Sequence, residues 1–161
     1  MFKLISNGPE GGDCTAPYIV ELNGEYTVKT FIADVLKIKD EWGYIGIEHG
    51  RSIFGDPHCE YSNGKLKTLL PDKYLNLKVV SASAHGGWSR MDYILGVEVT
   101  HEATHNVTEH YCIRREDIFG EDAYVVYRIG NVGPGRGIGA FRNVNAAINE
   151  CKYLERLNKE D

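Results

Sequence analysis

Apolar side chains recur with a helical period in two stretches of the chain, and this constrains the fold more than any other feature. Over 27–39 they fall mostly at i, i+3, i+4, i+7 and i+8, which places them on one stripe of a helix. A second stripe of this kind begins after Asn143. Thr27 and Asn143 are suitable N-cap residues, and Tyr26 can pack onto Phe31 beside the first cap. The sequence therefore predicts two helices, one in each half of the chain.

The remaining patterned segments are typical of strands, because β-branched and aromatic residues are frequent in them and several alternate with period two. The predicted strands are 1–6, 17–23, 42–48, 75–84, 91–101, 111–113, 123–129 and 138–142. We interpret 42–48 as a buried strand. The pair Asn63-Gly64 predicts a short hairpin, Gly86-Gly87 a turn, and the glycine-rich stretch 130–137 a wide hairpin loop.

The order of elements over residues 1–100 is hairpin, helix, strand, short hairpin and strand. This order resembles the β-grasp (ubiquitin-like) architecture, in which a mixed sheet wraps one helix; the resemblance is one of topology, without a sequence motif. After about residue 100 arginine replaces lysine as the main cation, which favours a second unit. The predicted class is thus α+β, with a β-grasp-like unit over 1–100 and a strand-strand-helix extension over 101–161 packed on it.

Composition and charge narrow the class of protein. A length of 161 residues allows one domain, or one domain with a smaller added unit, and 42% hydrophobic residues suffice for a core. The net charge of −5 argues against a nucleic-acid partner. No apolar run is long enough for a membrane span or a secretion signal, and the four cysteines contain no C-x-x-C pair. We therefore expect a cytoplasmic protein without membrane association.

The sharpest chemical motif is H-E-x-x-H, formed by His101, Glu102 and His105. In zinc hydrolases a helix brings these two histidines to one ion, and the glutamate acts as general base. Half of the residues over 97–108 are β-branched, however, which favours a strand. Two residues four steps apart in a strand are separated by about 13 Å, too far to share an ion. The sequence therefore predicts no metal, no cofactor and no catalytic residue.

Four residues on two predicted loops are the candidate binding residues: Trp88, Arg90, Arg136 and Arg142. Tryptophan and arginine contribute strongly to protein recognition through contact area and bidentate hydrogen bonds. The alternative for Arg90 is a structural ion pair with Asp92. The loop that contains Arg136 lacks the lysine and hydroxyl residue of a phosphate-binding loop. If the two loops lie close together, their arginines form a cationic spot.

These observations predict a non-catalytic binding module that acts on a protein partner through exposed loops or an extended sheet edge. Small acidic proteins of this kind are typical inhibitors or adaptors of phages and other mobile elements, which is an association and not a derivation. Two alternatives stay open. One is a zinc-dependent hydrolase at His101, Glu102 and His105, and the other is a protein that binds a small nucleotide-like anion through Arg90 and Arg136.

Overall fold

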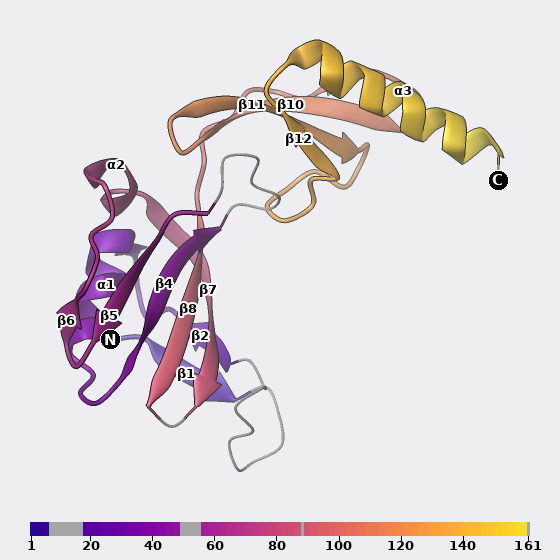
Figure 1. Ribbon diagram of the computed structural model, residues 1–161. Helices are drawn as coiled ribbons and strands as arrows, with labels where there is room; N and C mark the ends of the chain where they lie inside the picture. The colour runs from indigo at the N-terminus through magenta and orange to yellow at the C-terminus, as the bar shows by residue number, and fades with distance from the viewer. Residues whose placement is uncertain (7–17, 49–55, 88, 161) are drawn as a thin grey trace. The chain divides into compact units, whose positions relative to one another are not determined.

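The computed structural model describes residues 1–6, 18–48, 56–87 and 89–160 (Figure 1). Within these ranges the chain divides into two compact units, of which the first ends at Glu98 and the second begins at Val99. Both contain strands and helices, which confirms the α+β class. That the second unit packs on the first stays a prediction. No helix in these ranges has the length and apolar character that crossing a bilayer requires.

The first unit contains a mixed sheet of eight strands. They are β1 (Lys3–Ser6), β2 (Tyr18–Glu21), β3 (Tyr26–Thr27), β4 (Trp42–Glu48), β5 (His58–Ser62), β6 (Lys65–Leu66), β7 (Lys78–Gly87) and β8 (Arg90–Val97). Their order is β1-β2-β7-β8-β4-β5-β6, with β3 beside β7. The pair β4·β8 is parallel. Asn63 and Gly64 both have positive φ, so the hairpin predicted there, between β5 and β6, is confirmed.

Helix α1 (Val28–Leu36) fills one face of this sheet with its apolar stripe. Thr27 is its N-cap and forms a capping box with Thr30, as its position in the sequence predicts. Phe31 is completely buried; its ring stacks on Phe2 at 4.6 Å and meets the ring of Tyr26 edge-on at 5.9 Å. The predicted packing of Tyr26 on Phe31 is therefore confirmed, and the helix ends earlier than residue 39.

Two predictions around β7 are wrong. The strand expected over 75–84 begins only at Lys78, because Asp72–Leu75 forms the short helix α2. Gly86 is not part of a turn but lies in β7, opposite Met91 of β8. Its φ is 130°, and a Cβ atom there would lie 2.5 Å from the Arg90 carbonyl oxygen. A glycine is needed at this point because the two backbones approach too closely for a side chain.

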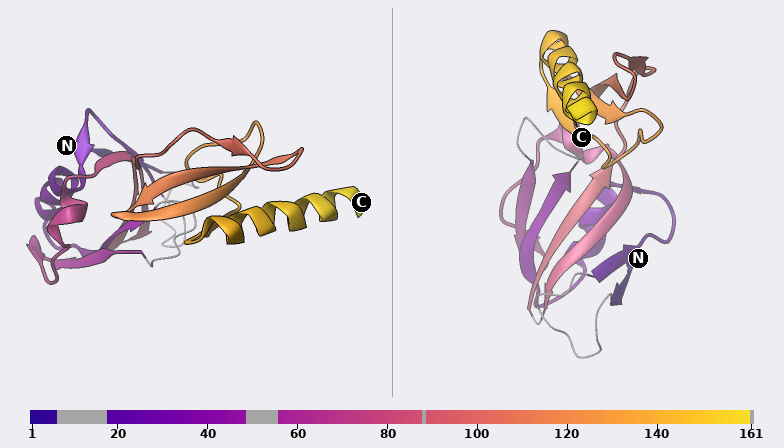
Figure 2. Two further views of the ribbon diagram at one scale, coloured as in Figure 1. Left: turned by 90° about the horizontal axis from the view of Figure 1, so that it is seen from above. Right: turned by 90° about the vertical axis from the view of Figure 1, so that its right-hand side faces the viewer.

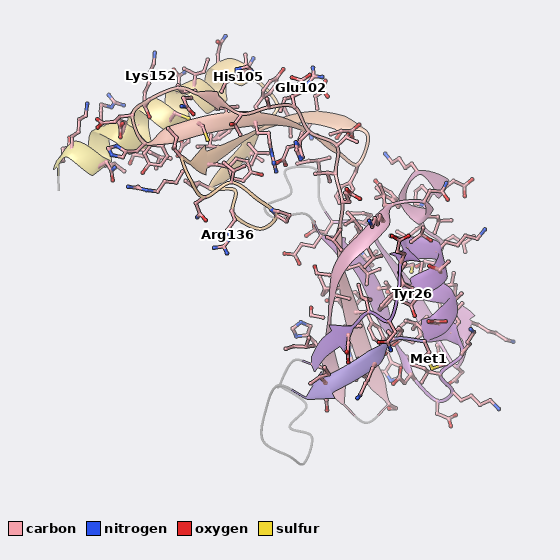
Figure 3. All side chains as sticks on the ribbon, turned by 180° about the vertical axis from the view of Figure 1, so that it is seen from behind. Met1, Tyr26, Glu102, His105, Arg136 and Lys152 are labelled. Atoms are coloured by element: carbon pink, nitrogen blue, oxygen red, sulfur yellow. The ribbon has the colours of Figure 1, made fainter. Side chains whose placement is uncertain are left out.

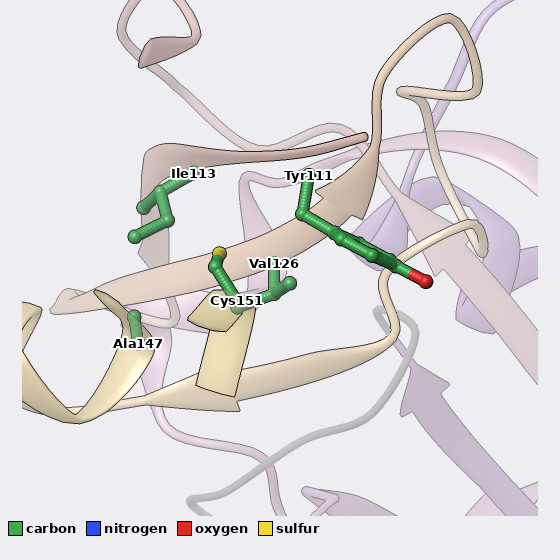
Figure 4. Close-up of a cluster of buried hydrophobic side chains, with 5 residues drawn as sticks. All are labelled: Tyr111, Ile113, Val126, Ala147 and Cys151. Carbon is green, nitrogen blue, oxygen red and sulfur yellow. The ribbon is translucent and has the colours of Figure 1, made fainter. Parts of the chain in front are cut away.

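The second unit has a four-stranded antiparallel sheet in the order β12-β11-β10-β9. Its strands are β9 (His105–Asn106), β10 (Tyr111–Ile118), β11 (Glu121–Arg128) and β12 (Gly139–Phe141), and helix α3 (Val144–Glu160) follows (Figure 2). The Asn143 Oδ1 accepts the Asn145 N–H at 2.7 Å, so the predicted cap is confirmed. Five buried residues join α3 to one sheet face: Tyr111, Ile113, Val126, Ala147 and Cys151 (Figure 4).

A buried polar cluster lies on the other face of this sheet, where the alternation of β10 places Arg114 and Glu116. Glu116 is 1% exposed and accepts hydrogen bonds from Arg114 Nε at 2.7 Å and from the Tyr127 hydroxyl. Burial raises the pKa of Tyr127, and its bond to Glu116 acts in the same direction. From the sequence alone, the acidic pair Glu116-Asp117 is expected on a solvated, turn-like segment after the strand predicted over 111–113. This prediction is wrong, because β10 continues to Ile118 and Glu116 is buried.

The hydroxyl of Tyr26 fixes the start of α1 by donating a hydrogen bond to Asp34 Oδ2 at 2.7 Å. This bond is the main reason that the pKa of Asp34 lies below its ordinary value of 3.8. We expect Tyr26→Phe to lower the free energy of unfolding by about 1.5–3 kcal/mol at neutral pH, because it removes a buried bond to a charged group. Urea unfolding measures this loss.

The loss depends on pH with a defined sign. Because the folded-state pKa of Asp34 is depressed, the stabilisation is complete above the unfolded value of 3.8 and disappears as the pH falls through the folded value. The difference between Tyr26→Phe and wild type therefore shrinks at about pH 3. Tyr153→Phe, on an exposed ring, is the control and changes stability by less than about 0.5 kcal/mol. An equal loss for Tyr26→Phe at both pH values contradicts this role.

Candidate functional site

Strands β4, β5 and β8 have one face against α1 and a second face that stays partly exposed. Tyr93, for example, is fully buried and meets Phe31 of α1 edge-on at 5.6 Å, whereas Trp42 on the second face is 46% exposed. We call this second face the open face; its residues are Trp42, Tyr44, Gly46 and Glu48 of β4, His58, Glu60 and Ser62 of β5, and Arg90, Asp92 and Ile94 of β8.

Among the predicted binding residues that the structure describes, Arg90 is the one that lies on the open face. Its guanidinium carbon lies 4.5 Å above the Trp42 ring, and its Nε and Nη2 donate to Asp92 Oδ2 at 3.1 and 3.0 Å. The other Asp92 oxygen accepts the Tyr44 N–H at 3.1 Å. The predicted ion pair with Asp92 is therefore confirmed. It holds the arginine in one orientation, so that guanidinium and indole form a fixed platform.

Two hollows adjoin each other on the open face. The first, the acidic hollow, has a volume of about 340 Å³ and is lined by Tyr44, Gly46, Ile47, Glu48, Asp56, His58 and Ile94. The second, the arginine hollow, has a volume of about 250 Å³ and is lined by Trp42, Gly43, Tyr44, Glu60, Tyr61, Ser62, Lys67 and Arg90.

Tyr44 lines both hollows, and its ring meets the His58 ring edge-on at 6.0 Å. Gly46 lines the acidic hollow, where a Cβ atom would be in van der Waals contact with Ile94 Cδ1 at 3.4 Å. Two carboxylates, Glu48 and Asp56, line the acidic hollow, whereas two cations and one carboxylate, Glu60, line the arginine hollow. The two hollows therefore differ in the charge that they favour in a ligand.

The other three predicted binding residues are Trp88, Arg136 and Arg142. Trp88 lies outside the described residues. Arg136 is exposed on the loop between β11 and β12 (Figure 3), and Arg142 is exposed just after β12 and already has an interaction partner. Both belong to the second unit, whereas Arg90 belongs to the first. A cationic spot that combines the three arginines stays a prediction.

The H-E-x-x-H residues do not lie on a helix. His101 makes an isolated bridge to Glu116, and His105 begins β9 opposite Ile113. Glu102 is exposed and forms an ion pair with Arg115 at 2.7 Å (Figure 3). The prediction of extended, non-helical backbone is confirmed here. Because the histidines are not one helical turn apart, they lack the geometry by which zinc hydrolases of this motif hold their ion.

Trp42 and Tyr44 are not among the predicted binding residues, because the prediction of a buried strand over 42–48 assigns neither side chain to the surface. In the structure the buried residues of β4 alternate with Trp42, Tyr44 and Glu48, which are exposed or half-buried. This alternation is visible in the sequence, because Trp42 and Tyr44 are an even number of positions away from the charged Glu48. Period-two phasing from Glu48 backwards would have assigned both aromatic residues to the open face.

The open face offers a fixed cation, aromatic surface, carboxylates and two hollows, a set of groups suited to recognition. Nothing in this geometry singles out a nucleophile and a base within hydrogen-bond reach of each other among the described residues that line the hollows. Comparison with known proteins gives no match for this chain among protein-family models, curated proteins or solved structures.

Proposed function

We propose that the chain is a binding module without catalytic activity and that it takes a segment of a protein partner on the open face. The observation that supports this most is the pair of hollows that share Tyr44, one lined by two carboxylates and the other by two cations and one carboxylate. Trp42 and Arg90 are residue types that dominate the energetics of protein interfaces. Because Asp92 already orients Arg90, little side-chain entropy is lost when a partner binds.

The chemistry of the hollows defines the partner. A lysine or arginine side chain fits the acidic hollow, because Glu48 and Asp56 line it. A carboxylate or an aromatic ring fits the arginine hollow, beside Arg90 and Lys67. The proposed partner segment thus presents a basic residue and, close to it, an acidic or aromatic residue.

The wider setting of the chain is part of the same proposal. We keep the role of a small inhibitor or adaptor from a phage or other mobile element, acting in the cytoplasm. The β-grasp-like architecture of residues 1–100 is likewise proposed; the hairpin, helix α1 and the strands that follow it support this assignment. The parallel pair β4·β8 is the feature that a related fold has to share.

The test is affinity capture from the native host with wild type and two single variants. Trp42→Ala removes half of the cation–aromatic platform, and Leu69→Ala removes an apolar side chain that is 80% exposed elsewhere in the first unit. We expect one partner to be captured by wild type and by Leu69→Ala but not by Trp42→Ala. With that partner purified, Trp42→Ala should weaken binding by about 2 kcal/mol or more, the size typical of a central interface residue.

A charge reversal examines the acidic hollow separately. Glu48→Lys is expected to weaken the same partner, whereas Glu25→Lys, at an exposed position outside the open face, leaves binding unchanged. A partner that binds Trp42→Ala and Glu48→Lys as well as wild type, or the lack of any partner that distinguishes them, overturns the proposal.

A further inference from the structure

A third cavity lies within the second unit, between the turn before β10 and helix α3. Its volume is about 500 Å³, and it is lined by Thr108, Asn149, Lys152, Glu155, Arg156 and Lys159. Asn149, Lys152, Arg156 and Lys159 recur along α3 at intervals of three or four residues and so share one flank of the helix (Lys152 is labelled in Figure 3). This flank forms one wall of the cavity, and the segment that contains Thr108 forms another.

The cations on this flank form no close ion pair with described residues. Neither Lys152, Arg156 nor Lys159 has a carboxylate oxygen within 4.0 Å in that part of the chain. The guanidinium carbon of Arg156 lies 6.0 Å from the centre of the Tyr153 ring. Like charges on successive turns repel each other. Three such charges around one cavity thus favour an anion inside it.

The single carboxylate in the cavity wall, Glu155, is occupied by the turn. Glu155 is 6% exposed; its Oε1 accepts the His110 N–H at 3.1 Å, and its Oε2 lies 2.9 Å from His110 Nδ1. Burial alone would raise the pKa of Glu155, but the contacts with His110 outweigh it and lower the pKa. The carboxylate therefore joins α3 to the turn, and it also interacts electrostatically with Lys159. The cavity wall still has three cations against this one carboxylate.

A metal ion is the other ligand to consider here, because ligand atoms of Glu109, His110 and Glu155 lie within 4.8 Å of one another. Binding an ion would replace the contacts between His110 and Glu155. The ion would also lie close to the flank that contains Lys152, Arg156 and Lys159. Both effects oppose a cation and favour an anion.

We propose that this cavity binds a small polyanion with two or more phosphate groups, the chemistry of a nucleoside diphosphate or an inorganic polyphosphate. Lys152 and Lys159 are separated by a helical rise of about 10.5 Å, so the charge extends along the cavity. Arginine binds phosphate in a bidentate manner and lysine as a point charge. Thr108 Oγ accepts the Tyr111 N–H, so its own O–H remains a donor.

Isothermal titration with inorganic triphosphate at low ionic strength tests the proposal. We expect one site per chain in wild type. The site variant Lys152→Gln/Arg156→Gln/Lys159→Gln should lose at least about tenfold in affinity. The control variant Lys29→Gln/Lys39→Gln/Lys65→Gln removes the same net charge from exposed positions of the first unit and should bind as wild type does. This comparison separates a site from an effect of overall charge.

A fourth variant tests the cavity in the opposite direction. Glu155→Gln keeps a carbonyl acceptor for the His110 N–H but removes the negative charge, so a folded variant should bind triphosphate several-fold more tightly. No binding by wild type, equal losses in the site and control variants, or unchanged affinity in Glu155→Gln overturns the proposal. Trp42→Ala should bind triphosphate normally, so a failure here is distinct from a failure of the open face.

Discussion

Replacement of Glu116 by alanine is expected to lower the free energy of unfolding by about 3–5 kcal/mol, because it leaves the guanidinium of Arg114 buried without its counter-ion. Arg114 is 8% exposed, and its Nε and Nη2 lie 2.7 and 2.6 Å from Glu116 Oε1. The remaining partner of the guanidinium in this cluster is the Tyr127 hydroxyl, at 3.2 Å. Chemical unfolding, followed by the circular dichroism of the aromatic residues, measures the loss.

The matched control removes both charges. In Arg114→Met/Glu116→Leu the apolar side chains fill similar space without an unpaired ion, so most of the loss should be recovered. An exposed ion pair of the same sheet gives the second control: Glu102→Ala removes the partner of Arg115 at 2.7 Å and should cost about 0–1 kcal/mol. A small loss for Glu116→Ala, similar to that of Glu102→Ala, would show that the buried pair does not stabilise the second unit.

Replacement of Phe31 by alanine is the second large effect, and we expect it to cost about 3–5 kcal/mol. Phe31 is fully buried, stacks on Phe2, and meets Tyr26 and Tyr93 edge-on. Its removal leaves a cavity between α1 and the sheet that the aromatic neighbours fill only in part. Thermal and urea unfolding should both show the change.

The control for Phe31→Ala is Lys29→Ala, on the exposed side of the same helix, with an expected effect within about 0.5 kcal/mol. Phe31→Leu should lie between the two, because the smaller cavity loses fewer contacts. If Phe31→Ala loses no more than Lys29→Ala, the ring is not the centre of the first unit's core.

Local features of the fold were predictable because the residues that decide them are neighbours in sequence. Thr27 caps α1 through a residue three positions away, and Asn63-Gly64 form their turn with no distant partner. The apolar stripe after Asn143 likewise predicts a helix where α3 lies, and its members Ala147 and Cys151 are buried. Capping, turn geometry and helical period act over a few residues.

Features that depend on distant backbone were not predictable in the same way. The sequence around Gly86 predicts a turn, but the residue lies in β7, where the Arg90 carbonyl oxygen of β8 leaves no room for a side chain. The sequence predicts a solvated Glu116, but the side chain is buried beside Tyr127 of the neighbouring strand β11. Whether a charged side chain is buried follows from which strands pair, and the sequence around it does not specify that pairing.

The candidate sites also have some features that the sequence predicts and others that depend on the tertiary structure. Arginine 90 and its ion pair with Asp92 followed from the sequence, since two residues separated by one position lie on the same side of a strand. The platform with Trp42 did not, because it requires the parallel pairing of β4 with β8. The cavity beside α3 similarly required Thr108 and the helix to come together.

The sequence by itself determined the α+β class, the position of the two long helices, and the extended backbone at His101–His105, since all three depend on local periodicity and side-chain shape. Tertiary structure alone decided that Arg90 lies over Trp42, which charges are buried, and which cations share a cavity. The physical reason is that strand register and helix docking are set by the burial of many side chains together. Each site combines residues from separate segments of the chain, and their separation in sequence does not give their distance in space.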